Sequence, residues 1–566
     1  MTAPASTTVG LRRWALRGWV VVLVLLLLGR ALGPGFVLSY DMVWVPQLTL
    51  RPEFFGLGSS VPRAVPSDAV IGILDNLVPA WLLQKLVLAG SLVAGGLGIA
   101  HWVEKDGRAS IGAAAAATVY VWNPYVAERL VIGHWPMLLC YGIAPWLARS
   151  VLRSCEGGRI RPEFFVLVPL ASLSASAGVA TVVIVSGFAA ARGARRLFGL
   201  MLGAVLLANL PWIVAGILNA DALSGVDAGA RFFRATGEAG VPMPLTAISL
   251  GGIWNTEVVP GSRTTPVAWV TTLLVVVAFV AARSRLTQSP TWRWLAIGAV
   301  GWLVAVLGWL LPGGLDTLAQ LVPGFGLLRD SSRLLVLLAP AVALAVGITV
   351  SRLATLAGEV GPVTAAICAI APVFVMPDAA WGIGGRLDAV HYPSSYAAMR
   401  EAVEEVHRGG DVLVLPFTTY RAPTWNGHRK VFDPVGRYQP FDQLVSDVLV
   451  VDGTRLTPED PRAEGVMRAL GESSPDARAA ALARLGIGTV VTDRVLAQQA
   501  GQVERSAQVS GRLSLAAGEF EVTGLDRISA TPAGHSRILL TYFVWAMYFL
   551  VPAVGVTWWR LRRHIE

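Results

Sequence analysis

The chain has 566 residues, of which 54% are hydrophobic and only 15% are charged, and its mean hydropathy is +0.58. Soluble domains carry about 25% charged residues, so this composition excludes an ordinary soluble protein and indicates a membrane protein. The formal net charge is +9, but the basic residues occur in short runs between apolar segments. That pattern indicates membrane topology and not a nucleic-acid-binding surface.

Apolar segments of the length that crosses a membrane, about 20 residues, recur along the whole chain. They cover approximately 14–32, 80–100, 109–122, 135–152, 163–191, 197–217, 265–282, 293–311, 333–352, 362–381 and 538–559. The segment 163–191 exceeds one crossing, since about 29 helical residues reach about 43 Å at ~1.5 Å per residue. Its small and polar middle, 172–178, predicts a bend between two short spans, buried by neighbouring helices. We therefore expect twelve spans, or eleven if this segment crosses once.

Arginines mark the cytoplasmic ends of these segments, because cytoplasmic loops are enriched in Lys and Arg. Arg12, Arg13 and Arg17 precede the first segment, and another basic cluster, at 560–563, follows the last one. Both termini are therefore expected in the cytoplasm. The loops expected on the outer side are 33–79, 123–134, 218–264 and 312–332.

Between the last two spans the composition becomes that of a soluble domain. A helix, a glycine stop and an apolar strand occur twice in succession, as 396–406 with 411–416 and as 477–485 with 487–492. The repeated unit predicts a small α/β domain with a partly parallel sheet. The segments 512–515 and 519–523 are expected to close this sheet as a hairpin.

These segments divide the chain into three parts. Residues 1–381 are expected to form the multi-span part, 382–536 the α/β domain, and 537–566 the final span with a basic cytoplasmic tail. The expected fold class is a polytopic α-helical membrane protein with a C-terminal α/β domain before its last span. On the expected topology, this domain lies on the extracytoplasmic side of the cell membrane.

The first carboxylate in the chain, Asp41, follows the first apolar segment and falls in the first outer loop. An acid at this position stays ionised near the water interface and still faces a lipid-borne substrate. Asp68 and Asp75 lie in the same loop and are further candidate acids or metal ligands. The structural alternative for Asp41 is an acid that caps a helix or pairs with an arginine.

The loop after the third segment contains Asn123-Pro124-Tyr125, Glu128-Arg129 and Gly133-His134-Trp135. Together with Asp41 and the C-terminal α/β domain, this stretch resembles the GT-C superfamily of multi-span glycosyltransferases, especially the actinobacterial arabinofuranosyl- and mannosyltransferases of the cell wall. The resemblance implies transfer of arabinofuranose or mannose from a polyprenyl-phosphate donor. The implied acceptor is a cell-envelope glycan or lipoglycan on the outer side of the membrane.

The resemblance also implies a role for Asp41 as the base that accepts the proton of the acceptor hydroxyl. Many members have two acids in the first loop, adjacent or one residue apart, whereas Asp41 here stands beside Ser39, Tyr40 and Met42. The leaving group is a lipid phosphate, so a guanidinium or a divalent cation (Mg²⁺, Mn²⁺ or Ca²⁺) is expected near it. No organic cofactor is expected.

The remaining candidate residues were chosen by their place at the outer span mouths or by their side-chain chemistry. Arg129, Arg329 and Arg333 are candidates for binding the donor phosphate, and Glu128 and His134 for orienting the donor or a metal ion. Trp254, Trp425 and His428 are candidates for binding the acceptor, since aromatic rings stack on sugars. Each also has a structural interpretation: an ion pair for Glu128 and Arg129, and an interfacial position for the aromatic residues.

Two other functions remain open at this stage. One is a transporter, flippase or polymerase of lipid-linked saccharides, and the other is a scaffold that binds partners through its α/β domain. Transporters place ionisable residues inside their spans and show internal repeats. Here the acids gather at the span mouths, which favours the glycosyltransferase.

Overall fold

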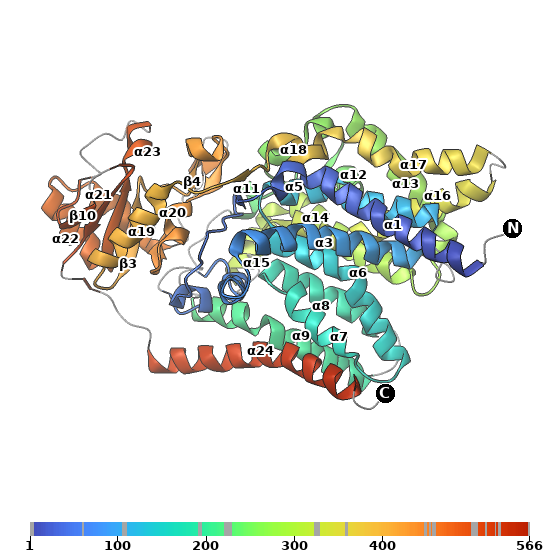
Figure 1. Ribbon diagram of the computed structural model, residues 1–566, viewed down its shortest axis with the longest axis horizontal. Coiled ribbons are helices and arrows are strands. Elements are labelled where there is room, and N and C mark those ends of the chain that lie inside the picture. Colours follow the sequence, from blue (N-terminus) through green and yellow to red (C-terminus); the bar gives the residue numbers. More distant parts are fainter. Residues whose placement is uncertain are drawn as a thin grey trace.

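A computed structural model describes residues 5–58, 62–104, 110–190, 195–219, 229–321, 329–356, 360–446, 450–451, 454–455, 460–499, 508–515, 518–526, 528–529 and 534–563. Parts of the expected outer loops 218–264 and 312–332 lie outside these residues. Figure 1 shows a helical part, an α/β domain at one end of it, and the last helix running back alongside the helical part. The first helix starts, and the last helix ends, away from the α/β domain.

Six described helices are long and apolar enough to cross a membrane. They are α1 (Ala5–Leu28), α3 (Ala80–Val103), α9 (Arg195–Leu218), α13 (Val267–Leu286), α14 (Trp292–Leu310) and α24 (His535–Arg563). Two bent pairs bring the number to eight. In one, η7 (Ser331–Leu337) meets α16 (Ala339–Leu356) at 42°, and in the other α17 (Gly361–Val375) meets the 377–385 segment at 67°. The expectation of twelve or eleven spans therefore stays a prediction.

The bend expected within 163–191 is present between two short helices. α7 (Pro162–Ala171) ends at Ser172, and α8 (Ala175–Ala189) begins after Ser174, whose hydroxyl accepts a hydrogen bond from the Ala177 N–H at 3.3 Å. Thr181 in turn donates to the Ala171 carbonyl at 2.8 Å. Because these bonds satisfy backbone groups inside the protein, the break is tolerable at membrane depth.

The expected third span is a much shorter helix. α4 (Ile111–Val121) has 11 residues, too few to cross a membrane alone, and its alanines 113 and 115–117 are fully buried. α5 (Pro124–Val131) follows directly, with Asn123 as its N-cap and proline at its first position, where the missing N–H costs nothing. After α5 the chain turns again into α6 (Trp135–Glu156). A tight corner therefore lies on each side of α5, one after α4 and one before α6.

The α/β domain contains a five-stranded mixed sheet in the order β10-β11-β9-β3-β6. The strands are β3 (Asp411–Leu415), β6 (Gln443–Leu444), β9 (Ile487–Asp493), β10 (Arg512–Leu515) and β11 (Phe520–Gly524). β3 pairs in parallel with β6 and β9, and the hairpin expected at 512–523 is present as β10 and β11.

Both faces of this sheet are covered. Val412 and Val414 pack with helix α19 (Ser394–Val406), whereas Leu413 and Leu415 pack with α21 (Pro461–Leu470) and α22 (Pro475–Arg484). Burial of both faces explains why the strands have continuous apolar sequences without alternation.

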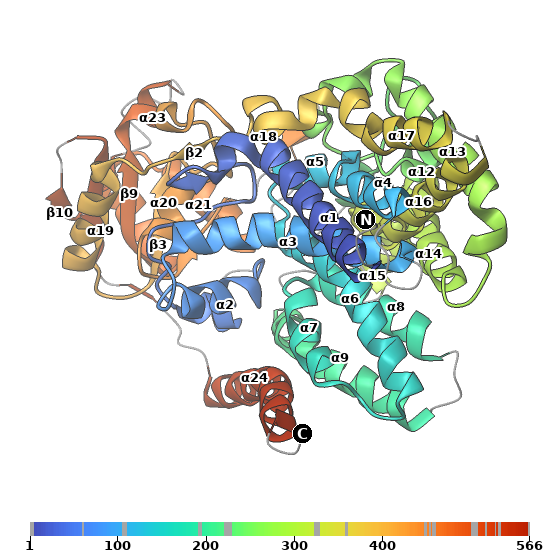
Figure 2. The same cartoon turned by 45° about the vertical axis from the view of Figure 1, so that its right-hand side comes forward.

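The backbone of the first loop is hydrogen-bonded to the α/β domain. β1 (Phe36–Val37) pairs antiparallel with β2 (Ala389–Val390), which lies at the start of the domain. Further along, the Tyr40 N–H donates to the Lys430 carbonyl at 2.8 Å, and the Phe432 N–H donates to the Tyr40 carbonyl at 2.8 Å. Figure 2 shows this early segment between α3 and the domain. The loop that carries Asp41 is therefore fixed from both sides.

Candidate active site

Asp41 lies in a tight turn that is pressed against the corner between α5 and α6. The Met42 N–H donates to the Ser39 carbonyl at 2.8 Å, and the Asp41 N–H donates to the Ile132 carbonyl at 3.1 Å. Gly133 has a φ of +86°, and a Cβ there would lie 2.2 Å from the Met42 nitrogen. Only glycine permits this approach, because it has no Cβ and tolerates positive φ.

Two side chains from distant parts of the sequence contact the Asp41 carboxylate. The Tyr420 hydroxyl, in strand β4 (Tyr420–Arg421) of the α/β domain, donates to Asp41 Oδ1 at 2.7 Å. His134 Nε2 lies 3.4 Å from Asp41 Oδ2. The Asp41 side chain remains 43% exposed, so it is held from two sides and open on a third.

The hydrogen bonds of His134 determine its protonation. Arg129 Nη1 donates to His134 Nδ1 at 3.0 Å, and arginine has no acceptor. Nδ1 therefore carries no proton, and the neutral ring carries its proton on Nε2, where Asp41 is the acceptor. Arg333 Nη2, which lies 3.3 Å from the same Nε2, then contacts the ring without a hydrogen bond to that nitrogen. Burial, followed by the positive charge of Arg333, lowers the pKa of His134 to about 4, so the ring is neutral at pH 7.

Opposing effects act on the pKa of Asp41. Its partial removal from water works to raise that pKa, whereas the hydrogen bonds from His134 and Tyr420 and the positive charge of Arg333 lower it. The lowering effects are larger together, and the pKa lies below the usual value. Asp41 is therefore ionised at neutral pH.

Asp330 joins two arginines to this site. Its buried Oδ2 accepts hydrogen bonds from Arg129 Nη1 at 3.1 Å and Arg333 Nε at 3.0 Å, and its Oδ1 accepts one from Ser332 at 2.6 Å. Burial works to raise the pKa of Asp330, but the two guanidinium groups hold that pKa well below its usual range. Arg129 is fully buried, whereas Arg333 exposes 32% of its side chain.

The Asn-Pro-Tyr motif positions the same cluster. Asn123 caps α5, from which Arg129 extends, by accepting the Val126 N–H at 3.0 Å. The Tyr125 hydroxyl donates to the Arg333 backbone carbonyl at 2.8 Å, and the Arg129 guanidinium lies 5.2 Å from the Tyr125 ring centre. The motif thus fixes the first turn of η7 against α5.

Glu128 lies in a second buried cluster. Burial and the negative charge of Glu238 raise the pKa of Glu128 well above its usual value. Glu238 accepts hydrogen bonds from Arg263 Nε at 2.5 Å and the Gly252 N–H at 2.6 Å. Glu128 therefore lies next to Glu238 of the 238–263 loop.

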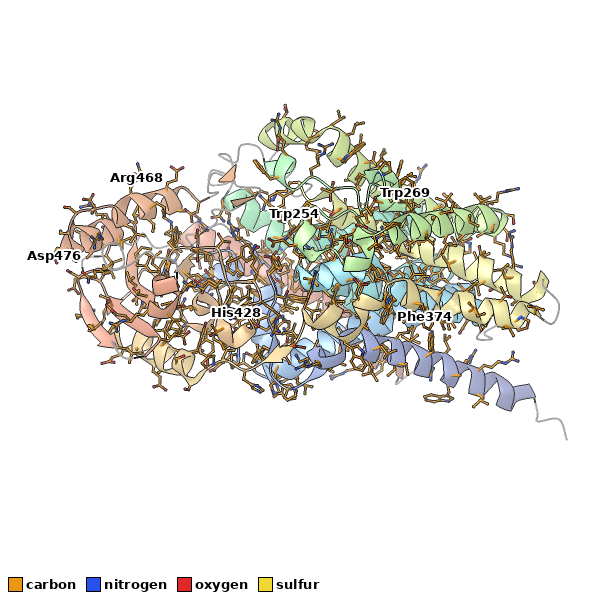
Figure 3. The ribbon with its side chains drawn as sticks, turned by 90° about the horizontal axis from the view of Figure 1, so that it is seen from above. Trp254, Trp269, Phe374, His428, Arg468 and Asp476 are labelled. Atoms are coloured by element: carbon orange, nitrogen blue, oxygen red, sulfur yellow. The ribbon has the colours of Figure 1, made fainter. Side chains whose placement is uncertain are left out.

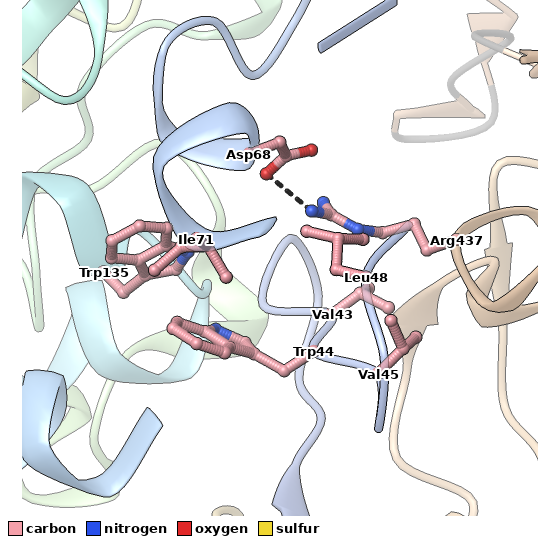
Figure 4. Close-up of a pocket in the computed structure, with 8 residues that line it drawn as sticks. All are labelled: Val43, Trp44, Val45, Leu48, Asp68, Ile71, Trp135 and Arg437. Atoms are coloured by element: carbon pink, nitrogen blue, oxygen red, sulfur yellow. Dashed lines mark ion pairs between the residues drawn. The ribbon is translucent and has the colours of Figure 1, made fainter. Parts of the chain in front are cut away.

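The two other acids of the first loop have separate partners. Asp68 forms an ion pair with Arg437 of the α/β domain at 2.5 Å, beside a cavity of about 10 Å³ lined by Trp44 and Trp135 (Figure 4). Asp75 accepts the Leu48 N–H at 2.8 Å. Asp68 therefore fastens the loop to the domain, and Asp75 fastens the loop to itself.

The remaining candidates have partners other than Asp41. The Arg329 guanidinium is 4.6 Å from the Phe233 ring, which contacts Trp254 edge-on at 4.8 Å. The Trp425 ring packs against Tyr392 and Tyr396 in an aromatic cluster, so it is part of the interior of the domain. His428 is exposed at the junction of the domain with the helices (Figure 3).

The residues of the site do not make a ligand set for a divalent cation. In the described part of the chain, no three His, Cys, Asp or Glu side chains come together at metal-binding distances. Asp41 and His134 supply one pair, and the Nε2 atom of that pair carries a proton. Arg333 and Arg129 are the cationic groups that the site itself supplies.

Comparisons with known proteins show which solved structures share the fold of this chain. No family model and no curated protein matches the chain. The cryo-EM structure of arabinofuranosyltransferase AftD from Mycobacteria aligns with 91% of this chain and 40% of its own, at 18% identity and a TM-score of 0.52. A mutant of AftD aligns with 92% of this chain and 42% of its own, at 18% identity and a TM-score of 0.54.

The chain has the GT-C fold. The archaeal oligosaccharyltransferase AglB from Archaeoglobus fulgidus also aligns, with 85% of this chain and 69% of its own, at 9% identity and a TM-score of 0.45. This GT-C chain spans about 40% of the length of AftD.

Proposed function

We propose that this GT-C protein is a membrane glycosyltransferase that moves a sugar from a polyprenyl-phosphate donor to a hydroxyl of a cell-envelope glycan or lipoglycan. The observation that carries the proposal is the ionised, partly exposed Asp41, held by Tyr420 and by the neutral His134 next to Arg333. The fold shared with AftD supports it. Because AftD is an arabinofuranosyltransferase, arabinofuranose is the first sugar to test, and mannose is the second.

In the proposed reaction, Asp41 accepts the proton of the acceptor hydroxyl. The acceptor oxygen forms a bond to the anomeric carbon of the donor sugar. The bond from that carbon to the phosphate oxygen breaks, and the phosphate leaves with the electron pair as polyprenyl phosphate. The Asp41 oxygen that faces His134 makes the longer contact, at 3.4 Å, and is the one more available to a substrate hydroxyl.

His134 acts as a positioning residue in this reaction. Its Nε2 already carries a proton, and Arg129 occupies its Nδ1, so it has no site for the proton that Asp41 receives. A hydrogen bond from a neutral imidazole keeps Asp41 oriented without neutralising its charge. Arg129 in turn orients His134, and its burial removes it from direct contact with the donor.

Arg333 is the group best placed to stabilise the leaving phosphate. Asp330 fixes its Nε, Nη2 lies 3.3 Å from His134 Nε2, and 32% of the side chain is exposed. Two arginines and one aspartate leave this cluster with one net positive charge. A fixed guanidinium at a site of developing negative charge stabilises the transition state.

The active site is proposed to face the extracytoplasmic side. The loops expected on the outer side supply Asp41, His134, Glu238 and Asp330, and these meet at the end of the helices that carries the α/β domain. Their convergence supports the expected topology, because loops on opposite sides of a membrane cannot meet.

The proposal is tested with purified protein in lipid nanodiscs. Synthetic short-chain polyprenyl-phosphate arabinofuranose or mannose is supplied with an oligosaccharide acceptor, and mass spectrometry detects the new glycosidic bond. We expect Asp41→Asn to lower the rate by about 100-fold or more. The matched control is Asp476→Asn, at an exposed residue on the far side of the α/β domain (Figure 3).

Two results would count against this function. Full activity of Asp41→Asn would show that Asp41 is not the base. Movement of a lipid-linked saccharide across the membrane without any new glycosidic bond would instead support the transporter or flippase.

A further inference from the structure

A polar cavity of about 100 Å³ lies between the first loop and the α/β domain. Six ionisable residues line it: Arg51, Glu53, Arg63, Asp68, Arg437 and Asp460. A single water needs only about 10–15 Å³ of such volume, so this cavity has room for a much larger polar group. The neighbouring cavity of Figure 4, across the Asp68–Arg437 pair, has about 10 Å³ and no such room.

The charges around the cavity are balanced. Three arginines face three carboxylic acids, and the pairs Arg51–Glu53 and Asp68–Arg437 are 2.6 and 2.5 Å apart. A balanced lining gives no net attraction for a phosphate or a metal ion. It offers many hydrogen-bond donors and acceptors at fixed positions, which suits a neutral polyhydroxyl compound.

The polar groups are held rigidly, so a ligand would not have to order them. Arg51 donates to the Gly436 and Gln439 carbonyls at 3.0 and 3.1 Å, and the Gln443 N–H donates to Glu53 at 3.4 Å. Burial, only partly opposed by the charge of Arg51, raises the pKa of Glu53 to about 7. At neutral pH, Glu53 therefore exchanges between the acid, whose hydroxyl donates, and the carboxylate, which accepts, so the net charge of the lining stays within one unit of zero.

Aromatic rings complete the lining. Phe54 and Phe432 border the cavity, and Phe432 is half-buried, with part of its surface open. Sugar sites commonly combine an apolar ring surface, which packs on the C–H groups of the sugar, with a few fixed polar groups that bind its hydroxyls. The lining of this cavity has that composition.

The cavity is next to the proposed base. The Phe432 ring lies 6.3 Å from the Tyr420 ring, and the Tyr420 hydroxyl donates to Asp41. Arg63 is near enough for its charge to oppose the effect of burial, which raises the pKa of Tyr420. Phe432 and Tyr420 thus connect the cavity to the carboxylate.

We propose that this cavity binds a sugar unit of the acceptor glycan, next to the unit whose hydroxyl reacts at Asp41. The inference rests on the proposed function and assigns its acceptor to a neutral oligosaccharide that contacts both the first loop and the α/β domain. The enzyme then requires an acceptor of at least two sugar units, because one unit cannot reach both the cavity and Asp41.

The test measures acceptor binding separately from catalysis. Wild-type protein and the variants Glu53→Gln and Arg63→Ala are placed in nanodiscs, and titration calorimetry follows the binding of neutral arabinofuranosyl and mannosyl oligosaccharides without donor. The KM for acceptor and donor and the kcat are then measured. Glu401→Gln, at an exposed acid of α19, is the matched control, and Arg63→Ala likewise changes an exposed side chain.

We expect each variant to raise the oligosaccharide Kd and the acceptor KM by about tenfold, which is the loss of one or two hydrogen bonds to the ligand. The donor KM and kcat should stay within about twofold of wild type. Unchanged acceptor KM and Kd in both variants would overturn the inference and leave the transferase intact, with water as the occupant of the cavity. Oligosaccharide binding that both variants weaken, without any transfer by the wild type, would support the cavity site and reject the transferase.

Discussion

The Tyr420 hydroxyl donates a 2.7 Å hydrogen bond to Asp41 across 379 residues of sequence. One partner belongs to the α/β domain and the other to the loop after the first helix. The proposed base is therefore shared between two parts of the protein, and the domain is expected to control catalysis directly.

Tyr420→Phe should lower kcat by about tenfold, since a hydrogen bond to a charged group contributes about 1.5–3 kcal/mol. Loss of the bond also raises the pKa of Asp41, so the acidic limb of the rate profile should move to higher pH. The readout is the transfer rate between pH 4 and 8, with Tyr542→Phe, at an exposed residue of α24, as the control. An unchanged profile would mean that Tyr420 has no influence on the base.

Arg333→Gln should lower kcat by about 100-fold, as the loss of one group that stabilises developing negative charge typically does. Because the side chain is 32% exposed, the apparent melting temperature should change little. Arg468→Gln, at an exposed residue of α21 (Figure 3), serves as the control. A kcat equal to that of the wild type would mean that another cation stabilises the leaving phosphate. Arg329 would then be the next residue to test.

Asp330→Asn should destabilise the protein by about 3–5 kcal/mol, because it leaves two guanidinium groups together without a counter-charge. Thermal unfolding in nanodiscs measures this effect, and Asp476→Asn should leave the melting temperature nearly unchanged. A melting temperature equal to that of wild type would show that water or lipid compensates the two arginines.

The pH dependence should reflect the low pKa of His134. Its pKa in the folded protein is about 4, against an ordinary 6.5, so the neutral ring is the form that the fold favours. The stability that depends on this ring is complete above pH 6.5 and is lost as the pH falls through about 4. Transfer activity should likewise persist well below pH 6.5.

Thermal unfolding and rate profiles between pH 4 and 8 check this expectation. His134→Gln should remove the acid-dependent loss of stability, and His535→Gln, at an exposed residue, should not. A rate profile that falls with a midpoint near 6.5 would show a charged His134 in the working enzyme.

The sequence predicted the features that depend on local pattern. The small and polar residues 172–178 marked the bend between α7 and α8, and the apolar runs at 411–416 and 487–492 marked β3 and β9. The positive-inside rule placed Asp41 and His134 on one side of the membrane, and the structure brings them within 3.4 Å.

Contacts between distant segments had no local signal. Tyr420 was not identified, because an isolated tyrosine in a loop of another domain has no pattern that points to Asp41. Asp330 stands between Arg329 and Arg333 in the sequence, but its burial, which makes it the link between two arginines, is not visible in sequence. The alanines of α4 predicted a span because helices buried in protein and in lipid are equally apolar.

The pairing of β1 with β2 has a consequence for the engineering of this protein. Residues 36–42 hydrogen-bond both to the α/β domain and to the corner at 131–133, so the two halves are not independent modules. A chimaera that exchanged only the domain would displace Asp41, the proposed base. A successful graft must therefore include residues 36–42 of the first loop.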